Sequence, residues 1–258
     1  MPEGDTVYRS AKNLAAALDG SVLTRCDIRV PKFATIDLTG HTVDEVVSRG
    51  KHLLMRVGEY TLHSHLKMEG SWHLYSHEAR WRRPAWQARA ILENDQYVAV
   101  GFELGLFEVV DRAEEDDVVG HLGPDLLGPD WDAATAIDNL SSDPDREIGL
   151  ALLDQRNLAG FGNVYRCELC FLRGVLPTRP VGEVNDLPRM VTLGKRLIEA
   201  NKDRAERTTT GTLRGTTDWV YGRAGKPCLR CGTKILRGEL GENALQLRNT
   251  YWCPRCQS

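Results

Sequence analysis

The sequence predicts an α+β protein: an N-terminal helix and an antiparallel β-sandwich, followed by a helical segment and a small cysteine-rich module. Three observations support this prediction. Apolar residues recur at helical spacing near the start, alternate with period two from about residue 21 to 111, and give way to two Cys-x-x-Cys pairs near the end. With 258 residues, 41% of them hydrophobic, the chain is long enough for two domains and a metal-held appendage.

The first element is expected to be a helix that Asp5 caps, that runs to about Leu18 and that Gly20 ends. Its apolar face would consist of Val7, Ala11, Leu14, Ala15 and Leu18. Strands are expected at residues 22–23, 26–30, 53–57, 62–66, 88–92 and 97–100. Several short antiparallel strands in succession are typical of a sandwich.

Two Gly-Pro pairs, Gly123-Pro124 and Gly128-Pro129, indicate a domain boundary, and helical patterning resumes at Ala133. We therefore expect a sandwich domain at residues 1–115, a linker at 116–132, a helical domain at 133–218 and the cysteine-rich module at 219–258. The net charge is −3, but it is unevenly distributed. Residues 111–145 are strongly acidic and read as a solvated linker, whereas residues 201–258 are basic enough to meet phosphate.

The strongest single signal is the pair of motifs Cys228-x2-Cys231 and Cys253-x2-Cys256. Four thiolates at this spacing can surround one structural Zn²⁺ tetrahedrally. The alternatives are two disulfides or four unrelated core thiols. The odd total of seven cysteines, with no apolar leader before them, argues against an exported disulfide framework. The remaining pair, Cys167 and Cys170, falls in a helical run and is expected to be two plain buried thiols.

Several short motifs together resemble the formamidopyrimidine-DNA glycosylase/endonuclease VIII family, and they extend over nearly the whole chain. They are Met1-Pro2-Glu3-Gly4, residues 49–54 (RGKHLL), 65–71 (HLKMEGS), 122–125 (LGPD), 160–165 (GFGNVY), 221–223 (YGR) and 252–257 (WCPRCQ). The opening and residues 207–211 (RTTTG) are more similar to the endonuclease VIII branch. The resemblance implies a helix–two-turn–helix domain after the sandwich and a zinc-stabilised hairpin at the end.

The opening residues suggest a nucleophile. Removal of Met1 would leave Pro2 with a secondary amine, which can attack C1′ of a damaged nucleoside and form an iminium. Ordinary α-amino groups have a pKa of about 8, and a helix N-terminus disfavours the ammonium further. Glu3 beside it can protonate the sugar ring oxygen. A proline at position two is otherwise usually just a trimmed start; the resemblance assigns it, with Lys51, to catalysis.

The resemblance also implies DNA contacts. Asn163 follows two glycines that would let backbone amides approach a phosphate, although such a segment can equally be a helix-end turn. Arg248 matches the arginine that the family's zinc hairpin lays on phosphates, and Arg223 is a further phosphate contact. Met68 is the expected wedge that fills the space of an extruded base.

Three departures from the family pattern stand out. Thr6 occupies a position that usually offers a second carboxylate, and it stays open whether Asp5 substitutes. The cysteine pairs lie further apart than usual, so residues 238–243 are expected to form a longer hairpin tip. No arginine occurs in the expected loop at residues 101–107, where formamidopyrimidine-type members carry an arginine and an aromatic residue that fill the space of the extruded base. Met68 is then the remaining wedge, and Phe107 is the residue that a rearranged loop would most readily bring into that space.

The sequence thus predicts a bifunctional glycosylase and abasic-site lyase that excises oxidised bases, mainly pyrimidines, by β,δ-elimination. Two alternatives remain: an abasic-site lyase with weak base removal, and a non-catalytic binder of damaged DNA. The expected partners are damaged DNA, single-stranded or duplex, and one structural Zn²⁺. We expect a monomer in the bacterial cytoplasm, associated with the nucleoid, and no membrane span, since no run of about 18 apolar residues occurs.

Overall fold

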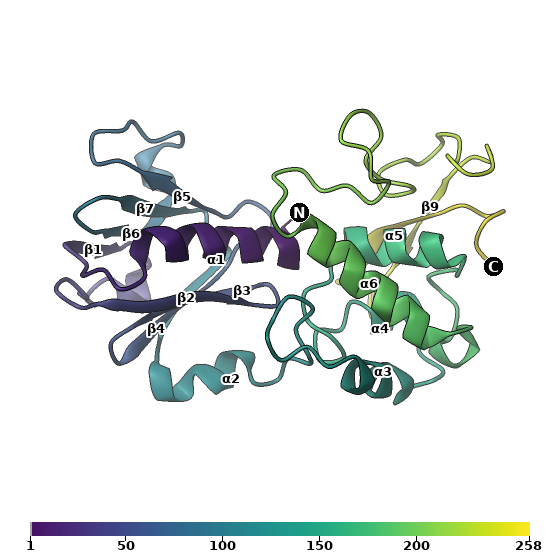
Figure 1. Ribbon diagram of the computed structural model, residues 1–258, viewed down its shortest axis with the longest axis horizontal. Helices are drawn as coiled ribbons and strands as arrows, with labels where there is room; N and C mark the ends of the chain where they lie inside the picture. The colour runs from purple at the N-terminus through teal and green to yellow at the C-terminus, as the bar shows by residue number, and fades with distance from the viewer. Residues whose placement is uncertain (1) are drawn as a thin grey trace. The chain divides into compact units, whose positions relative to one another are not determined.

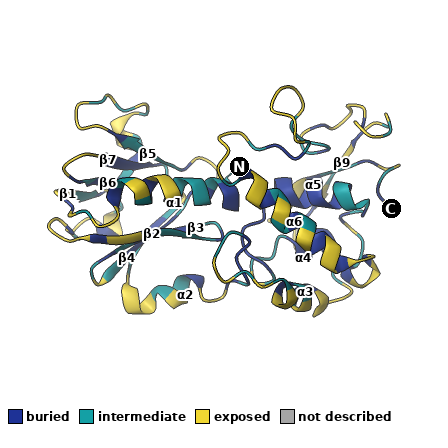
Figure 2. Cartoon of the chain, in the orientation of Figure 1, coloured by how far each residue is buried: buried dark blue, intermediate teal, exposed yellow. Residues whose placement is uncertain are grey.

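In the computed structural model, which describes residues 2–258, the chain begins with helix α1 (Gly4–Leu18) (Figure 1). Its buried side includes Val7, Ala11, Leu14 and Leu18, as the spacing predicts, and its opposite side is exposed (Figure 2). The expected cap at Asp5 is wrong. Glu3 is the N-cap, because its carbonyl oxygen accepts the backbone N–H groups of Thr6 and Val7. Asp5 lies in the first turn, where Oδ1 accepts the N–H of Thr6 at 2.7 Å.

The first compact unit, Met1–His121, also contains two four-stranded antiparallel sheets. The strand order of the first sheet is β1 (Arg25–Ile28), β6 (Ala88–Glu93), β7 (Val98–Phe102), β5 (Ser71–Tyr75). That of the second is β2 (Val43–Arg49), β3 (His52–Val57), β4 (Tyr60–His65), β8 (Leu106–Asp111). Side chains of both sheets and of α1 share one core, so the predicted α+β class with a sandwich is confirmed.

Strands β2, β5 and β8 were not among the expected ones. In β2 the pairing register shifts between Val43 and Glu45, which breaks the alternation that a strand prediction relies on. The expected loop at residues 101–107 is mostly strand: Gly101 and Phe102 end β7, and β8 begins at Leu106. Only residues 103–105 connect them.

The acidic stretch is not entirely solvated. Helix α2 (Glu115–Val119) follows β8, and both Nη2 of Arg56 and the hydroxyl of Thr61 donate to the carboxylate of Glu115, at 2.6 and 2.7 Å. The hydrogen bond and charge of Arg56 lower the pKa of Glu115. The start of the acidic stretch is therefore held against the second sheet.

The second compact unit, Leu122–Ser258, contains four helices and a hairpin among its elements. They are α3 (Ala133–Ser141), α4 (Ile148–Ala151), α5 (Asn163–Arg173), α6 (Leu187–Asn201), β9 (Leu236–Leu240) and β10 (Arg248–Trp252). Short 3₁₀ turns occur at Pro31–Phe33, Ala85–Gln87, Arg112–Glu114 and Val181–Glu183. The hairpin tip is residues 241–247, later in the chain than expected. Among residues 2–258, every helix is too short or too polar to cross a membrane.

Candidate functional site

Pro2 and Glu3 stand at the start of α1. Glu3 is fully buried, and Pro2, half-buried, precedes it directly. The helix dipole places partial positive charge at this end, which opposes protonation of an amine and favours an anion nearby. The backbone nitrogen of Pro2 therefore lies next in sequence to the buried carboxyl group of Glu3.

Lys51 lies at the same end of the first unit. The N–H of Gly20, just after α1, donates to the carbonyl of Val43 at 2.8 Å, so the end of α1 is beside the start of β2. The 15 residues of α1 and the seven of β2 both measure about 22 Å, and the two elements pack along each other. The turn that follows β2, with Gly50 at φ +59° and half-buried Lys51, consequently lies at the N-terminal end of α1 (Figure 1).

Met68 is 62% exposed at the turn between β4 and β5, as a wedge would need to be. The residue before it, Lys67, has φ +51°, a left-handed conformation that is uncommon for a side chain other than glycine. The Lys67 N–H donates to Nδ1 of His65 at 3.0 Å, which stabilises this turn. A hollow of about 300 Å³ beside Met68 is lined by both this turn and Glu103, Leu104 and Gly105.

The short β7–β8 connection offers no second wedge. Leu104 is 8% exposed, and Phe107 is 5% exposed within the sandwich core. Moving Phe107 into an extruded base's space would require β8 to leave the sheet. Met68 is thus the one residue of the predicted wedge set that the structure exposes.

Four histidines gather at the end of the second sheet that lies beside the turn of Lys51, and the sequence prediction gave none of them a role. The rings of His63, His65 and His121 have their centroids 4.9, 5.3 and 6.4 Å from that of His52. Pairwise hydrogen bonds join His52 to His63 and His63 to Glu108. The two-residue spacing of His63 and His65 along β4 was visible in the sequence, but the contact of His63 with Glu108 on β8 was not.

In the second unit, the sulfur atoms of Cys228, Cys231, Cys253 and Cys256 all lie within 4.8 Å of one another. Two of the separations are 3.5 Å (Cys231 to Cys253) and 3.9 Å (Cys228 to Cys256). A disulfide requires about 2.05 Å, whereas four sulfurs at about 2.3 Å from a tetrahedral Zn²⁺ lie about 3.8 Å apart. The four-cysteine cluster therefore fits a bound metal and not two disulfides. Cys167 and Cys170 are fully buried in α5, which confirms them as buried thiols, and burial raises the pKa of Cys167 to about 11.

Asn163 begins α5 and is 4% exposed. Its Nδ2 donates to the carbonyl of Asn249 at 2.8 Å, and its Oδ1 accepts from buried Arg166, which also donates to the hydroxyl of Thr250 at 2.6 Å. These bonds fix the strand that begins with exposed Arg248. Asn163 is thus bound to the hairpin directly and through Arg166, and its contact with phosphate stays a prediction.

Arg223 is 7% exposed, and its guanidinium donates to the carbonyls of Trp219 and, at 2.7 Å, Pro227. These bonds brace the segment just before Cys228. The predicted contact of Arg223 with phosphate stays a prediction.

Glu168 on α5 is a structural residue that the sequence did not reveal. Its buried carboxylate accepts the hydroxyl of Thr209 and the backbone N–H groups of Trp219, Val220 and Tyr221, the last three at 2.7–2.9 Å. It therefore holds the Thr/Gly-rich stretch of residues 208–217 and the segment that follows.

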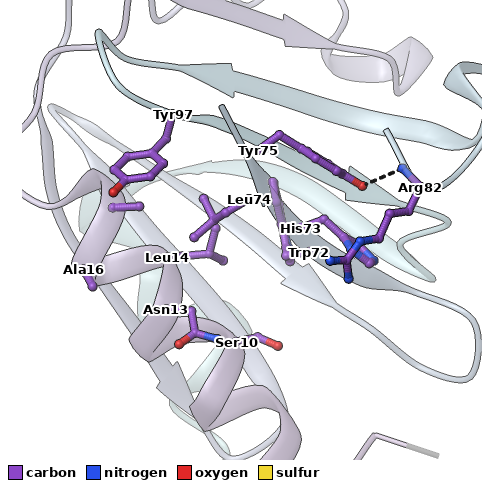
Figure 3. A pocket seen from close by; sticks show the side chains of 11 residues that line it. Ser10, Asn13, Leu14, Ala16, Trp72, His73, Leu74, Tyr75, Arg82 and Tyr97 are labelled. Carbon is purple, nitrogen blue, oxygen red and sulfur yellow. Dashed lines mark hydrogen bonds between the residues drawn. The ribbon is translucent and has the colours of Figure 1, made fainter. Parts of the chain in front are cut away.

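A separate groove of about 410 Å³ runs between α1 and β5 in the first unit. Figure 3 shows Asn13 and Ser10 of the helix on one side and His73, Tyr75 and Arg82 on the other, with the N–H of Arg82 donating to the Tyr75 hydroxyl. None of Pro2, Glu3, Lys51 or Met68 lines this groove, so it is no part of the candidate site.

Comparisons with known proteins agree with this geometry. The model of the formamidopyrimidine-DNA glycosylase N-terminal domain matches residues 1–102. The whole chain is similar to "Probable endonuclease 8 2" of Streptomyces coelicolor (56% identity, 94% of that protein). It is also similar to "DNA-(apurinic or apyrimidinic site) lyase Nei2" of Mycolicibacterium smegmatis (53% identity, 99% of that protein).

Among solved structures, a MutM complex with DNA containing carbocyclic 8-oxo-G has the same fold, with a TM-score of 0.81 and 21% identity over the full length of both chains. A Lactococcus lactis Fpg complex with abasic-site DNA gives 0.80 and 20%, also over both full lengths. Sequence identity above 50% along the entire chain, together with the buried glutamate at the start of α1 and the four-cysteine cluster, shows that the chain belongs to the formamidopyrimidine-DNA glycosylase/endonuclease VIII family.

Proposed function

We propose that the protein is a DNA glycosylase and abasic-site lyase that removes oxidised bases, mainly pyrimidines, in base-excision repair. The observation that carries this proposal is the joint placement of Pro2, buried Glu3 and Lys51 at one end of α1. Similarity to proteins named endonuclease 8 supports the substrate class. The protein would act as a monomer on chromosomal DNA in the cytoplasm.

The chemistry follows from the residues. With Met1 removed, the nitrogen of Pro2 attacks C1′ of the extruded nucleoside, and the bond from C1′ to the base breaks with its electron pair on the base. Glu3 protonates the sugar ring oxygen, so that the ring opens and an iminium forms between Pro2 and C1′. Loss of a proton from C2′ expels the 3′ phosphate, a second elimination expels the 5′ phosphate, and water then releases Pro2.

The four-cysteine cluster would hold one structural Zn²⁺. Four thiolates leave no coordination position for a water, so the metal's contribution is to fix the fold of this segment rather than to break bonds. The chain's own contribution is Arg248, an exposed guanidinium on the hairpin, which would meet a phosphate. Met68 would enter the space of the extruded base.

A second function has specific support. The relative from M. smegmatis is named as an abasic-site lyase, and the β7–β8 connection of only three residues gives little help in opening a duplex. An abasic-site lyase with weak base removal is therefore the alternative, and a non-catalytic DNA-binding protein is a third outcome of the test.

Borohydride trapping on single strands that each contain one lesion tests these options. Reduction of the iminium should give a covalent adduct that mass spectrometry maps to Pro2, and Pro2→Gly should greatly weaken trapping. Trapping on an abasic site but on no oxidised base would select the lyase alternative. An adduct on Lys51 alone would refute the assignment of the nucleophile, and no adduct on any strand would leave the non-catalytic reading.

Glu3→Gln separates the two activities. The variant should lose base removal while it keeps much of its cleavage of a preformed abasic site, because only the first step requires ring opening from an intact nucleoside. Equal losses of both activities would argue against Glu3 as the acid.

A further inference from the structure

The histidines beside Lys51 lie on one face of the second sheet. On β3, Leu53, Met55 and Val57 point into the sandwich core, so His52 points to the opposite face. Strand pairing places His65 opposite His52, and Glu108 opposite His63. Three strands therefore contribute to a single polar cluster of His52, His63, His65 and Glu108, which we call the histidine cluster.

Within it, a chain of two hydrogen bonds defines the tautomers. Oε1 of Glu108 lies 2.7 Å from Nδ1 of His63, and Nε2 of His63 lies 2.7 Å from Nδ1 of His52. An ionised carboxylate only accepts, so Nδ1 of His63 is the donor. A neutral His63 then accepts at Nε2, which requires the proton of His52 to be on Nδ1.

His65 is committed in a different direction. Its Nδ1 accepts the backbone N–H of Lys67, so this nitrogen carries no proton and the proton is on Nε2. An imidazolium has no lone pair to accept with, and the bond exists only with a neutral ring. It supports Lys67 in its left-handed conformation, one residue before Met68.

Burial favours the neutral forms of His52 and His65. It lowers the pKa of His52 to about 3, with the charges of His63, His65, His121 and Lys51 acting in the same direction. Burial, followed by the charges of Lys51, Lys67 and His63, lowers the pKa of His65 to about 4. At neutral pH both rings can therefore keep the hydrogen bonds that the geometry requires.

We propose that His52, His63, His65 and Glu108 are positioning residues that hold the turn of Lys51 and the turn of Met68 in one fixed arrangement. His52 directly follows Lys51, and His65 precedes Met68 by three residues. The two rings meet edge to face with centroids 5.3 Å apart, so movement of either turn displaces the other ring. The carboxylate of Glu108, on β8, holds the end of this chain of hydrogen bonds on a third strand. This proposal rests on the roles of Lys51 and Met68 proposed above.

Paired variants of His65 test the first arm. In His65→Asn the amide oxygen can take the place of Nδ1 and accept from Lys67, whereas His65→Leu fills space without accepting. We expect His65→Leu to lower the single-turnover cleavage of a preformed abasic site in single-stranded DNA at least about tenfold, since small misplacements of reacting groups are costly. His65→Asn should recover most of this loss, and the Kd for a strand with a reduced abasic site should change less than about twofold.

Glu108→Gln and Glu108→Leu test the second arm in the same assay. Glutamine keeps an acceptor for His63 and should retain most of the rate, and leucine should not. His73→Leu is the matched control, because this histidine lies on the other sheet, with Nε2 3.0 Å from the Ser71 hydroxyl. Its rate should equal that of the unaltered protein.

Equal rates for leucine and amide variants, or rates that fall only in proportion to thermal stability, would overturn the proposal. If leucine variants do not fold, nitrogen-15 NMR of the unaltered protein decides: at pH 6 His52 should be neutral with its proton on Nδ1, and His65 should be neutral with its proton on Nε2. A cationic His65 at that pH would contradict it. Failure of the proposed function is distinguishable, because the unaltered protein would then trap no abasic site.

Discussion

Nδ2 of Asn163 donates to the carbonyl oxygen of Asn249 at 2.8 Å and so ties the first residue of α5 to the second residue of β10. Arg248, the residue proposed to meet phosphate, immediately precedes Asn249. The place of that guanidinium is therefore set by a helix that begins 85 residues earlier in the chain.

Replacement of Asn163 by alanine should weaken DNA binding through the hairpin. Loss of a buried side-chain hydrogen bond costs about 1–2 kcal/mol, which corresponds to about tenfold in Kd if the hairpin moves. Titration of a labelled DNA strand that contains an abasic-site analogue measures the Kd of the variant and of the unaltered protein. Asn139→Ala is the control, since Asn139, on α3, makes a similar bond to the carbonyl of Asn157; an equal loss of affinity in this variant would contradict the prediction.

Cys253→Ser should remove the bound metal and reduce DNA affinity, because the cysteine is fully buried and one of the four sulfurs would be lost. Metal analysis of freshly purified protein should find one zinc per chain, and a strong chelator should reproduce the effect of the substitution. Cys26 is a half-buried thiol of the first unit, and Cys26→Ser should change neither the zinc content nor the DNA affinity. Purified protein without zinc would show that the ligand assignment is wrong.

Acid should destabilise the first unit well above the range in which carboxylates titrate. His52 and His65 have folded pKa values of about 3 and about 4, below the ordinary 6.5, so below pH 6.5 the unfolded chain binds protons that the folded one does not. The contribution of His52 and His65 to the free energy of unfolding is therefore fully present above pH 6.5. It is lost as the pH falls, by up to about 1.4 kcal/mol per pH unit for each histidine.

Thermal unfolding at pH 7 and pH 5 measures this loss. His65→Asn, which does not titrate in this range, should flatten the dependence, whereas the same change at exposed His77 should leave it as it is. The guanidinium of Arg56 lowers the pKa of Glu115, which adds to acid sensitivity only below about pH 4. A dependence unchanged by His65→Asn would refute the assignment.

Cleavage of a lesion in a single strand should equal or exceed cleavage in a duplex, with little discrimination among opposite bases. A duplex leaves an orphaned partner base, and of the two wedge candidates, Met68 and Phe107, Met68 alone is exposed to compensate for it. Met68→Ala should therefore reduce duplex activity more than single-strand activity.

Phe107→Ala should behave differently. Because Phe107 is in the core, the substitution should cost about 3–5 kcal/mol of stability and leave the ratio of the two activities unchanged. A strong duplex preference that this variant abolishes would show that β8 rearranges to supply a wedge.

The parts of the fold that depend on local patterns were predictable from sequence. The apolar spacing from Val7 to Leu18 indicated α1, and the cysteine spacing indicated the four-cysteine cluster, because the partners recur at fixed intervals. Strand β2 was missed because its register shift removes the alternation, and β8 because its first residues resemble a glycine-rich loop.

Partners distant in sequence were not predictable. The family resemblance implied a DNA contact for Asn163, which stays a prediction, but the bond of its side chain to the carbonyl of Asn249, 86 residues away in the sequence, could not be foreseen. The histidine cluster was missed for the same reason, since Glu108 meets His63 across 45 residues.

Glu168 has a consequence for how the second unit becomes ordered. Burial raises the pKa of this carboxyl group, and four hydrogen-bond donors between Thr209 and Tyr221 oppose that effect. Without those donors the carboxylate would have to stay in water, and α5 could not bury the side that carries Glu168. On another side of the same helix, Arg166 donates to the Thr250 hydroxyl of the hairpin. Because buried hydrogen bonds tie both the loop and the hairpin to α5, we expect this part of the protein to gain order in one cooperative step rather than segment by segment.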